Sequence, residues 1–296
     1  MSAGRSAAVD PAVADEVDGA VLTERSPRIA AAHRLLRRSR RTEVGEFLAE
    51  GAPAVTEAIA YARDHPGEVL ELFVTEAAAA RHTALVRSAF AARVEVTQVT
   101  EKAAAALSDA VTPQGIVVRC VHPQVGVADV LAGSPKLIAV LVGANDPGNA
   151  GTVIRLADAA GADGVILAGD SVDAFNPKTI RASAGSLFHL PVARTADTAE
   201  LLAGLTAAGL SVLATTGGAS IDLDAAAADG ILDLPTAWLF GSEAHGLPDE
   251  VIALADESVR VPIYGRAESL NLASAAAICL YASASAQRRS VGSPSS

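Results

Sequence analysis

The chain has 296 residues, of which half are hydrophobic and 3% are aromatic, and its formal net charge is -11. This length favours two domains over one small core. No apolar run approaches the roughly 18 residues that a membrane span needs, there is no signal-peptide pattern, and only two cysteines are present, without zinc-site spacing. These features argue against a membrane-spanning, disulfide-stapled or metal-stabilised protein, and we expect a cytoplasmic one.

The N-terminal region combines an expected tail with a basic segment. Residues 1–22 are expected to be a disordered tail, because acidic residues interrupt their alanine-rich sequence. Residues 24–41 then hold seven arginines against one acidic residue. Apolar residues at helical spacing predict an amphipathic helix over residues 27–38, and its other face carries Arg28, Arg34, Arg37 and Arg38. From charge alone this face either binds nucleic acid or is simply solvated.

Short strands and helices alternate in the first part of the chain. Strands are expected at residues 45–50, 69–74, 94–99 and 115–120, and helices at residues 53–63, 78–91 and 102–107. This alternation predicts a small α/β sandwich over residues 23–121. Glycine and proline breaks mark residues 122–134 as a linker.

The second part of the chain, residues 135–290, alternates again. Strands are expected at residues 137–142, 164–167, 211–214, 237–240 and 258–261, and helices at residues 151–160, 177–185, 199–207, 248–254 and 271–286. Near-continuous apolar strands such as 137–142 indicate a parallel sheet that is covered on both faces. Because ligands of such sheets bind beyond the carboxyl ends of the strands, we expect a site where three polar, glycine-containing motifs follow these strands.

The first motif, residues 145–155, connects an apolar strand to a helix. Its glycines let the backbone approach a ligand, and a helix N-terminus offers free N–H groups to an anion. The spacing is not that of a dinucleotide-binding G-x-G-x-x-G loop. Asn149 and Arg155 could converge on one phosphate or ribose, or Arg155 could simply pair with Asp158.

The second and third motifs also follow predicted strands. Residues 239–247 contain two glycines suited to a turn around a ligand, and the carboxylate of Glu243. An ordinary strand-to-helix loop is the alternative. Residues 261–271 lead into an alanine-rich helix, and Ser269 and Asn271 lie at its expected N-cap, so capping alone would also explain them.

Together the three motifs resemble the signature motifs of the SpoU (TrmH) family of RNA 2'-O-methyltransferases, in the SPOUT superfamily. The matching residues are Asn149, Gly151, Arg155, Gly241, Ser242, Glu243, Gly246, Pro262, Ser269, Leu270 and Asn271. Residues 176–185 also look like this family, whereas Val261 and Ile263 replace the isoleucine and methionine that the family often shows. Residues 23–119 are similar to the ribosomal-protein-like substrate-binding domain of such enzymes, as in the thiostrepton-resistance type.

The resemblance implies an α/β fold with a C-terminal trefoil knot, a homodimer, and S-adenosylmethionine as methyl donor without a metal. It implies cofactor contacts at Gly241, Val261, Ile263 and Leu270, with Thr216 and Gly217 as additional contacts. Arg155 would hold a substrate phosphate or the developing alkoxide, because an arginine is a poor proton acceptor. Asn149 and Ser269 would position the ribose, while Glu243 and Asn271 would order the motifs.

The expected substrate is 23S rRNA, because a ribosomal-protein-like domain with a basic helix suits a folded rRNA element. Two alternatives remain open. A tRNA 2'-O-methyltransferase would carry the same catalytic motifs, and a non-catalytic RNA-binding protein could retain the fold. A non-catalytic protein is the less favoured of the two, because the residues expected to act in catalysis are all present: Asn149, Arg155, Glu243, Ser269 and Asn271.

Overall fold

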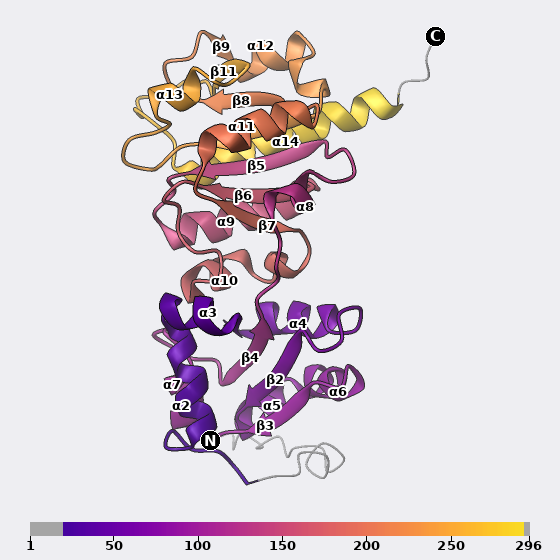
Figure 1. Ribbon diagram of the computed structural model, residues 1–296, viewed down its shortest axis with the longest axis vertical. Coiled ribbons are helices and arrows are strands. Elements are labelled where there is room, and N and C mark those ends of the chain that lie inside the picture. The colour runs from indigo at the N-terminus through magenta and orange to yellow at the C-terminus, as the bar shows by residue number, and fades with distance from the viewer. Residues whose placement is uncertain (1–19, 293–296) are drawn as a thin grey trace, which may run out of the picture. The chain divides into compact units, whose positions relative to one another are not determined.

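The computed structural model describes residues 20–292, which form two units, each with its own core (Figure 1). The first unit comprises residues 20–123 and the segment Phe175–Phe188, and the second comprises Gln124–Ala174 and residues 189–292. Within the described range, no helix combines the length and the apolar composition that crossing a membrane requires.

Most of the expected N-terminal tail lies outside the described residues, but its last residues lie inside them. Leu22 forms a parallel bridge with Val99, and its backbone N–H donates to the carbonyl oxygen of Gln98 at 2.9 Å. Leu22 therefore belongs to the folded first unit, and the boundary expected after residue 22 is too late.

The first unit is an α/β sandwich, as predicted. Its four strands have the spatial order β1-β4-β2-β3, with β4 antiparallel to both neighbours and β2 parallel to β3. The elements are α2 (Pro27–His33), η1 (Arg34–Leu36), α3 (Arg38–Val44), β1 (Glu46–Glu50), α4 (Ala52–Tyr61), β2 (Val69–Val74), α5 (Glu76–Arg81), α6 (Thr83–Ala91), β3 (Glu95–Gln98), α7 (Glu101–Ala106) and β4 (Ile116–Val121), with α10 (Pro177–Ser183) and η2 (Ser186–Phe188) from the later segment. Ile29 of α2 and Ala103 of α7 share a core cluster with Phe73 of β2, so these two helices cover one face of the sheet.

The basic helix predicted over residues 27–38 is interrupted. After α2 and the 3-10 turn η1, the backbone of Arg37 is extended, with φ -94° and ψ 130°, before α3 begins. The buried guanidinium of Arg41 donates hydrogen bonds to the carbonyl oxygens of Leu35 (2.8 Å) and Leu36 (3.0 Å). In a continuous helix these two carbonyls would accept backbone N–H groups four residues ahead. The side chain of Arg41 takes their place, which stabilises the break.

The helix predicted over residues 78–91 is also two helices, α5 and α6. His82 separates them with a non-helical backbone, φ -120° and ψ 38°. The hydroxyl of Thr83 donates to the carbonyl oxygens of Ala79 (3.3 Å) and Ala80 (3.2 Å). Such local side-chain hydrogen bonds compete with the bonds of a continuous helix.

The segment Phe175–Phe188, which the family resemblance places in the second domain, makes its contacts within the first unit. The ring centroids of Phe175 and Phe47 are 4.8 Å apart. Arg181 on α10 forms ion pairs with Glu50 and Asp109. Aromatic packing and charge pairing therefore hold this segment to the first unit although it is distant in sequence.

The second unit contains a parallel sheet of seven strands in the order β7-β6-β5-β10-β8-β11-β9, as the apolar strands predicted. Its elements are α8 (Val127–Leu131), β5 (Leu137–Val142), α9 (Pro147–Ala160), β6 (Gly164–Ala168), β7 (Val192–Thr195), α11 (Thr198–Ala207), β8 (Ser211–Thr215), β9 (Ile221–Asp222), α12 (Leu223–Ala228), η3 (Ile231–Asp233), β10 (Thr236–Phe240), α13 (Asp249–Ile252), β11 (Glu257–Arg260) and α14 (Leu272–Gly292).

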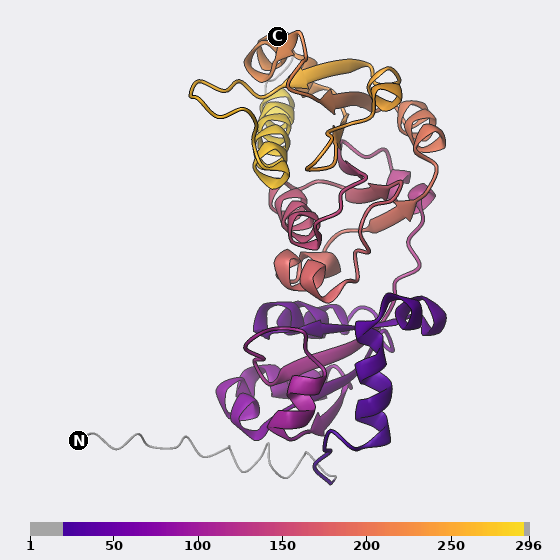
Figure 2. The same cartoon turned by 90° about the vertical axis from the view of Figure 1, so that its left-hand side faces the viewer.

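Helices cover both faces of this sheet. Ile138 and Val140 of β5 share a core cluster with apolar residues of α8, α11 and α13, so these helices cover one face. The other face is covered by α9 and α14, which also pack against each other, and Figure 2 shows α14 in yellow on the opposite side of the sheet from the orange α11. There the buried Trp238 donates its indole N–H to the hydroxyl of Ser283 on α14 at 2.9 Å.

Five short elements of the second unit are absent from the sequence prediction: α8, β7, β9, α12 and η3. The expected linker contains α8, whose Val130 is buried in the core, while β7 and β9 extend the sheet at its two edges. The two edge strands have only four and two residues, too few to show a clear alternation of apolar and polar positions.

Candidate active site

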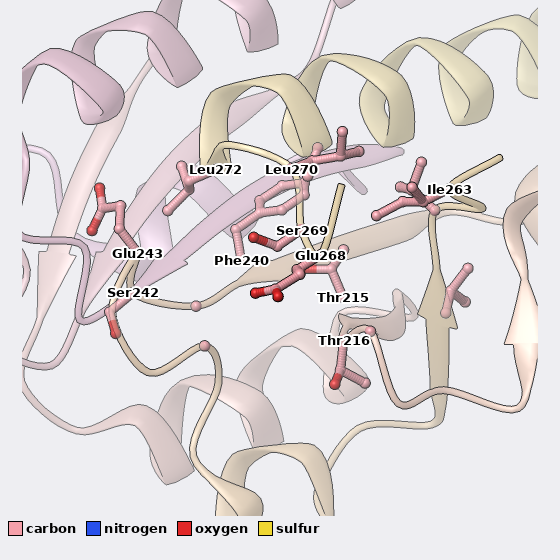
Figure 3. Close-up of a pocket in the computed structure, with 16 residues that line it drawn as sticks. Thr215, Thr216, Phe240, Ser242, Glu243, Ile263, Glu268, Ser269, Leu270 and Leu272 are labelled. Atoms are coloured by element: carbon pink, nitrogen blue, oxygen red, sulfur yellow. The ribbon is translucent and has the colours of Figure 1, made fainter. Parts of the chain in front are cut away.

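A pocket of about 250 Å³ lies at the carboxyl ends of β8, β10 and β11, neighbouring strands of the parallel sheet (Figure 3). All six residues expected to contact a cofactor line it: Thr216, Gly217, Gly241, Val261, Ile263 and Leu270. The fold thus brings together residues that lie in three separate segments of the sequence.

The loop after β10 is shaped by glycines. A Cβ atom on Gly241 would collide with the backbone of Gly246 and Leu247, so this position has no room for a side chain. Ser242 and Gly246 exchange backbone hydrogen bonds of 3.1 and 2.9 Å, and Gly246 adopts a positive φ of 70°. The loop therefore folds back on itself at the pocket rim, where glycine accommodates the left-handed backbone.

Three side chains from the three motifs form a continuous hydrogen-bonded series, which we call the polar chain. Asn271 donates from Nδ2 to Oδ1 of Asn149 at 3.2 Å, and Asn149 donates from Nδ2 to Oε1 of Glu243 at 2.9 Å. The other carboxylate oxygen of Glu243 accepts a longer bond, 3.4 Å, from the backbone N–H of Asn145. The polar chain links the first, second and third motifs directly.

Helix capping fixes both ends of this arrangement. Asp146 caps α9 by accepting the backbone N–H of Asn149 at 2.8 Å. At the start of α14, Oδ1 of Asn271 accepts the backbone N–H of Ala273 at 2.9 Å, while its amide nitrogen donates to Asn149. Capping is therefore confirmed for Asn271, and it coexists with the polar chain because the two roles use different atoms.

Ser269 does not cap α14. Its side chain lines the pocket, and it forms no hydrogen bond within residues 20–292. Glu268, Thr215 and Phe240 also line the pocket and were not among the residues expected from the sequence. Glu268 lies inside the third motif and Thr215 lies next to Thr216, so their positions in the sequence were the available signal.

Arg155 lies on the exposed surface of α9 and is neither in the polar chain nor on the pocket wall. The carboxylate of Asp158 instead bonds Nδ1 of His189 at 2.7 Å, which contradicts the alternative of an Arg155–Asp158 pair. In the described part of the chain the Arg155 guanidinium has no ion pair and no hydrogen bond. The convergence of Arg155 with Asn149 is therefore not seen within one chain.

The candidate RNA-binding arginines divide into two groups. Arg28 donates to carboxylate oxygens of Glu71 (2.9 Å) and Glu95 (2.7 Å), and the hydrogen bond with Glu71 is the main cause that raises the pKa of Arg28. The buried carboxylate of Glu71 thus holds Arg28 in the fold, and the RNA contact expected for Arg28 stays a prediction. The side chains of Arg34, Arg37 and Arg38 are exposed and make no ion pair with any described residue.

The pocket chemistry fits a small ligand that has both cationic and apolar parts. Its wall combines two carboxylates, Glu243 and Glu268, with hydroxyl groups and with the apolar side chains of Phe240, Val261 and Leu270. Carboxylates offset the positive charge of a sulfonium or an ammonium group, and the apolar walls suit an aromatic base. Among residues 20–292, no cluster of three or more histidine, cysteine or acidic residues could hold a metal ion.

Sequence comparisons define the class of this protein. The SpoU rRNA Methylase family matches residues 136–281, and the MRM3-like substrate binding domain matches residues 26–118. Over 247 residues the chain is 34% identical to the 23S rRNA (guanosine(2553)-2'-O)-methyltransferase RlmP of Bacillus subtilis (strain 168), covering 81% of this chain and 89% of that protein. The chain belongs to the SpoU rRNA methylase family, as its motifs predicted.

Solved structures show the same fold. The AdoMet-bound rRNA methyltransferase of Sinorhizobium meliloti has a TM-score of 0.73 at 31% identity, over 92% of this chain and 99% of that one. The SpoU methyltransferase AviRb of Streptomyces viridochromogenes, in complex with the cofactor AdoMet, has a TM-score of 0.75 at 29% identity, over 90% of this chain and all of that one. The similarity spans both units.

Proposed function

We propose that this protein transfers a methyl group from S-adenosylmethionine to a ribose 2'-hydroxyl of 23S rRNA. The polar chain beside the pocket carries the proposal, because it joins three distant motifs into one site. The name of the Bacillus subtilis relative, which acts on 23S rRNA, and the two AdoMet-bound crystal structures support the choice of substrate and cofactor.

The pocket residues would hold the cofactor, which supplies a methyl group on a sulfonium that is already a good leaving group. Gly241 leaves room for close backbone approach, and the apolar side chains of Val261, Ile263 and Leu270 would surround the base. Thr216 and Gly217 lie at the end of β8 and would close the pocket from the other side. Glu268 places a carboxylate near the positive charges of the ligand.

Ser269 and Asn149 would position the ribose. The hydroxyl of Ser269 faces the pocket without a partner in the described residues, so it is available to a substrate oxygen. One Nδ2 hydrogen of Asn149 bonds Glu243 and its Oδ1 accepts from Asn271, which leaves the second Nδ2 hydrogen for the substrate. Glu243 and Asn271 would act as positioning residues, since alignment of the reacting atoms contributes much of the rate in group transfer.

We further propose that the enzyme is a homodimer and that Arg155 acts at the subunit interface. On α14, which packs against the helix that carries Arg155, Tyr281 is 73% exposed and Ile278 is 40% exposed. Apolar side chains exposed next to one another are typical of an association surface. With a second copy on this face, Arg155 would reach the active site of the partner subunit. There its guanidinium would hold a substrate phosphate or the developing alkoxide, which it does not reach in the site of its own chain. The trefoil knot implied by the family resemblance stays part of this proposal.

Tyr281→Glu tests the dimer. Sedimentation analysis should show a wild-type dimer and a monomeric variant, because a carboxylate would have to be buried in the interface. Cofactor affinity of the variant should stay within about twofold, since Tyr281 does not line the pocket. A monomeric wild-type protein with full activity would refute the dimer.

Mapping of 2'-O-methyl groups in total RNA from cells with and without the gene tests the activity. We expect one 23S rRNA position to lose its methyl group in the deletion strain and to regain it when purified protein and S-adenosylmethionine are added. Methylation of tRNA alone would favour the alternative substrate. Calorimetric binding of S-adenosylmethionine with no change in the methylation of any RNA would instead favour a non-catalytic RNA-binding protein. The calorimetry is repeated with a chelator, which should leave affinity unchanged.

A further inference from the structure

The first unit contains a hollow of about 430 Å³ formed mainly by α2 and the residues that follow it. One residue of α7, which lies beside α2 (Figure 1), completes the lining. Its lining residues are Glu24, Ile29, Ala30, His33, Arg34, Arg37 and Ala106. None of them belongs to the candidate active site, which lies in the second unit.

The floor of the hollow is apolar, and a hydrogen bond fixes the orientation of the His33 ring beside it. Ala30 and Ala106 supply accessible aliphatic surface, and Ile29, which also lines the hollow, is a core residue with 1% of its surface exposed. Nδ1 of His33 lies 2.6 Å from the carbonyl oxygen of Ala106. Because a carbonyl can only accept, Nδ1 must be the donor, and Nε2 of the neutral ring is left as an acceptor. A planar ligand could therefore lie on the aliphatic floor with N–H groups directed at Nε2 or at the carboxylate of Glu24.

The rim of the hollow carries positive charge that the protein does not neutralise. In the same basic segment, Arg28 pairs with Glu71, Arg40 pairs with Glu43, and Arg41 bonds backbone carbonyls. The guanidinium groups of Arg34 and Arg37 have neither an ion pair nor a hydrogen bond within the described chain. In a protein with a net charge of -11, two unpaired cations at the rim of an apolar hollow complement an anion that carries a planar group.

We propose that this hollow binds one unpaired nucleotide of the RNA substrate. The base lies on the aliphatic floor, with its N–H groups toward His33 and Glu24, and the adjacent phosphate lies between Arg34 and Arg37. Proteins read RNA mainly at such unstacked bases in loops and bulges, through stacking and through contacts with arginine. This inference rests on the proposed function in one respect, that the substrate is RNA.

The test compares two synthetic RNA hairpins that are identical except for one bulged guanosine. Wild-type protein should bind the bulged hairpin on the order of tenfold more tightly, as expected for placing one base on a protein surface. Arg34→Ala with Arg37→Ala should remove this preference. The matched control, Arg25→Ala with Arg38→Ala, removes the same charge from the same segment outside the hollow and should keep it. Equal binding of the two hairpins by the wild type would overturn the proposal, as would loss of the preference in both double variants.

Ala30→Leu provides a test without a change of charge. Leucine is a good helix former, so α2 should be retained, and thermal unfolding would verify that the variant folds. Because the larger side chain occupies the hollow, the variant should bind both hairpins with the affinity of the wild type for the paired one. An undiminished preference for the bulged hairpin would refute the base position.

Methyl transfer by the wild-type protein to unmodified 23S rRNA is measured in parallel. If transfer occurs but Ala30→Leu and the Arg34/Arg37 variant keep the bulge preference, the hollow is not the nucleotide site and the proposed function stands. If wild-type protein prefers the bulged hairpin and the variants lose the preference, but no RNA is methylated, the nucleotide site stands and the proposed function fails.

Discussion

The polar chain of the second unit and the basic segment of the first unit, residues 24–41, are built in opposite ways. Asn271 and Asn149 are 122 positions apart in sequence, yet their side chains are hydrogen bonded. The arginines of the basic segment are neighbours in sequence, yet Arg28 and Arg41 are used inside the fold, while Arg34 and Arg37 are left to solvent or a ligand.

This difference shows that crowding of like residues in a sequence does not by itself define a site. In the polar chain each amide or carboxylate is held by a neighbour, so a substitution should act on the alignment of reacting groups and hence on rate. In the basic segment the exposed arginines have no fixed partner, so a substitution should act on affinity and on its dependence on salt. Substitutions in the two regions therefore test this contrast.

Arg155→Ala should lower the rate of methyl transfer by about 10² to 10³, because removal of a donor that stabilises developing charge commonly has this effect. Arg155→Lys should recover little of it, since a point charge cannot replace the planar fork. Single-turnover measurements report the rate, and calorimetry should show nearly unchanged cofactor affinity. The melting temperature should also be unchanged, because the side chain is exposed and Asp158 is bonded to His189. A near-normal rate in the alanine variant would exclude the proposed role.

Asn149→Ala and Asn271→Ala should each lower the transfer rate on the order of tenfold, and the double variant should be little worse than either single variant. Residues that act as one unit show such non-additive effects. The measurement is a double-mutant cycle on the single-turnover rate, with Ser274→Ala on the same helix as the control. Strictly additive effects would mean that the hydrogen bond between the two asparagines does not contribute to the reaction.

The basic segment should separate into affinity and stability effects. Alanine at Arg34, Arg37 and Arg38 together should reduce the slope of log affinity against log salt by up to about two to three, since each lost phosphate contact removes roughly 0.7 to 0.9. Arg28→Ala should leave the slope unchanged. It should instead lower the free energy of unfolding by about 1 to 3 kcal/mol, because the buried carboxylate of Glu71 loses a partner. Equal salt slopes in the triple variant and the wild type would show that the arginines are only solvated.

One cysteine in each unit allows the units to be followed separately. Burial raises the pKa of Cys279 to about 12 and also raises the pKa of Cys120. Because thiolate is the reactive form, iodoacetamide at pH 8 should label neither thiol until its unit unfolds. Mass spectrometry across a urea series would report each unit's midpoint. The raised pKa values favour the folded state while the thiols are neutral, so stability should fall as the pH rises above about 9. Rapid labelling of either thiol without urea would contradict its burial.

The bounds of two central strands and the residues that line the pocket could be predicted from the sequence alone. β5 has the predicted bounds because an uninterrupted apolar run needs no distant information to form a buried strand. β2 also has its predicted bounds, although Glu71 interrupts its apolar run. The motif glycines and polar residues identified the pocket because loops at the carboxyl ends of parallel strands meet at one edge of the sheet. All six expected cofactor residues accordingly line one cavity.

Contacts between distant parts of the chain determine which charged side chains are paired inside the fold. Arg28 lies 43 positions from Glu71, and Arg41 ends a helix by bonding carbonyls that helical periodicity assigns to the backbone. The segment Phe175–Phe188 makes its contacts in the first unit although the family pattern continues through it, and Asp158 pairs with His189 rather than with Arg155. Periodicity and turn chemistry act over a few neighbouring residues, whereas these partners are chosen by distances in the folded chain, which no local pattern contains.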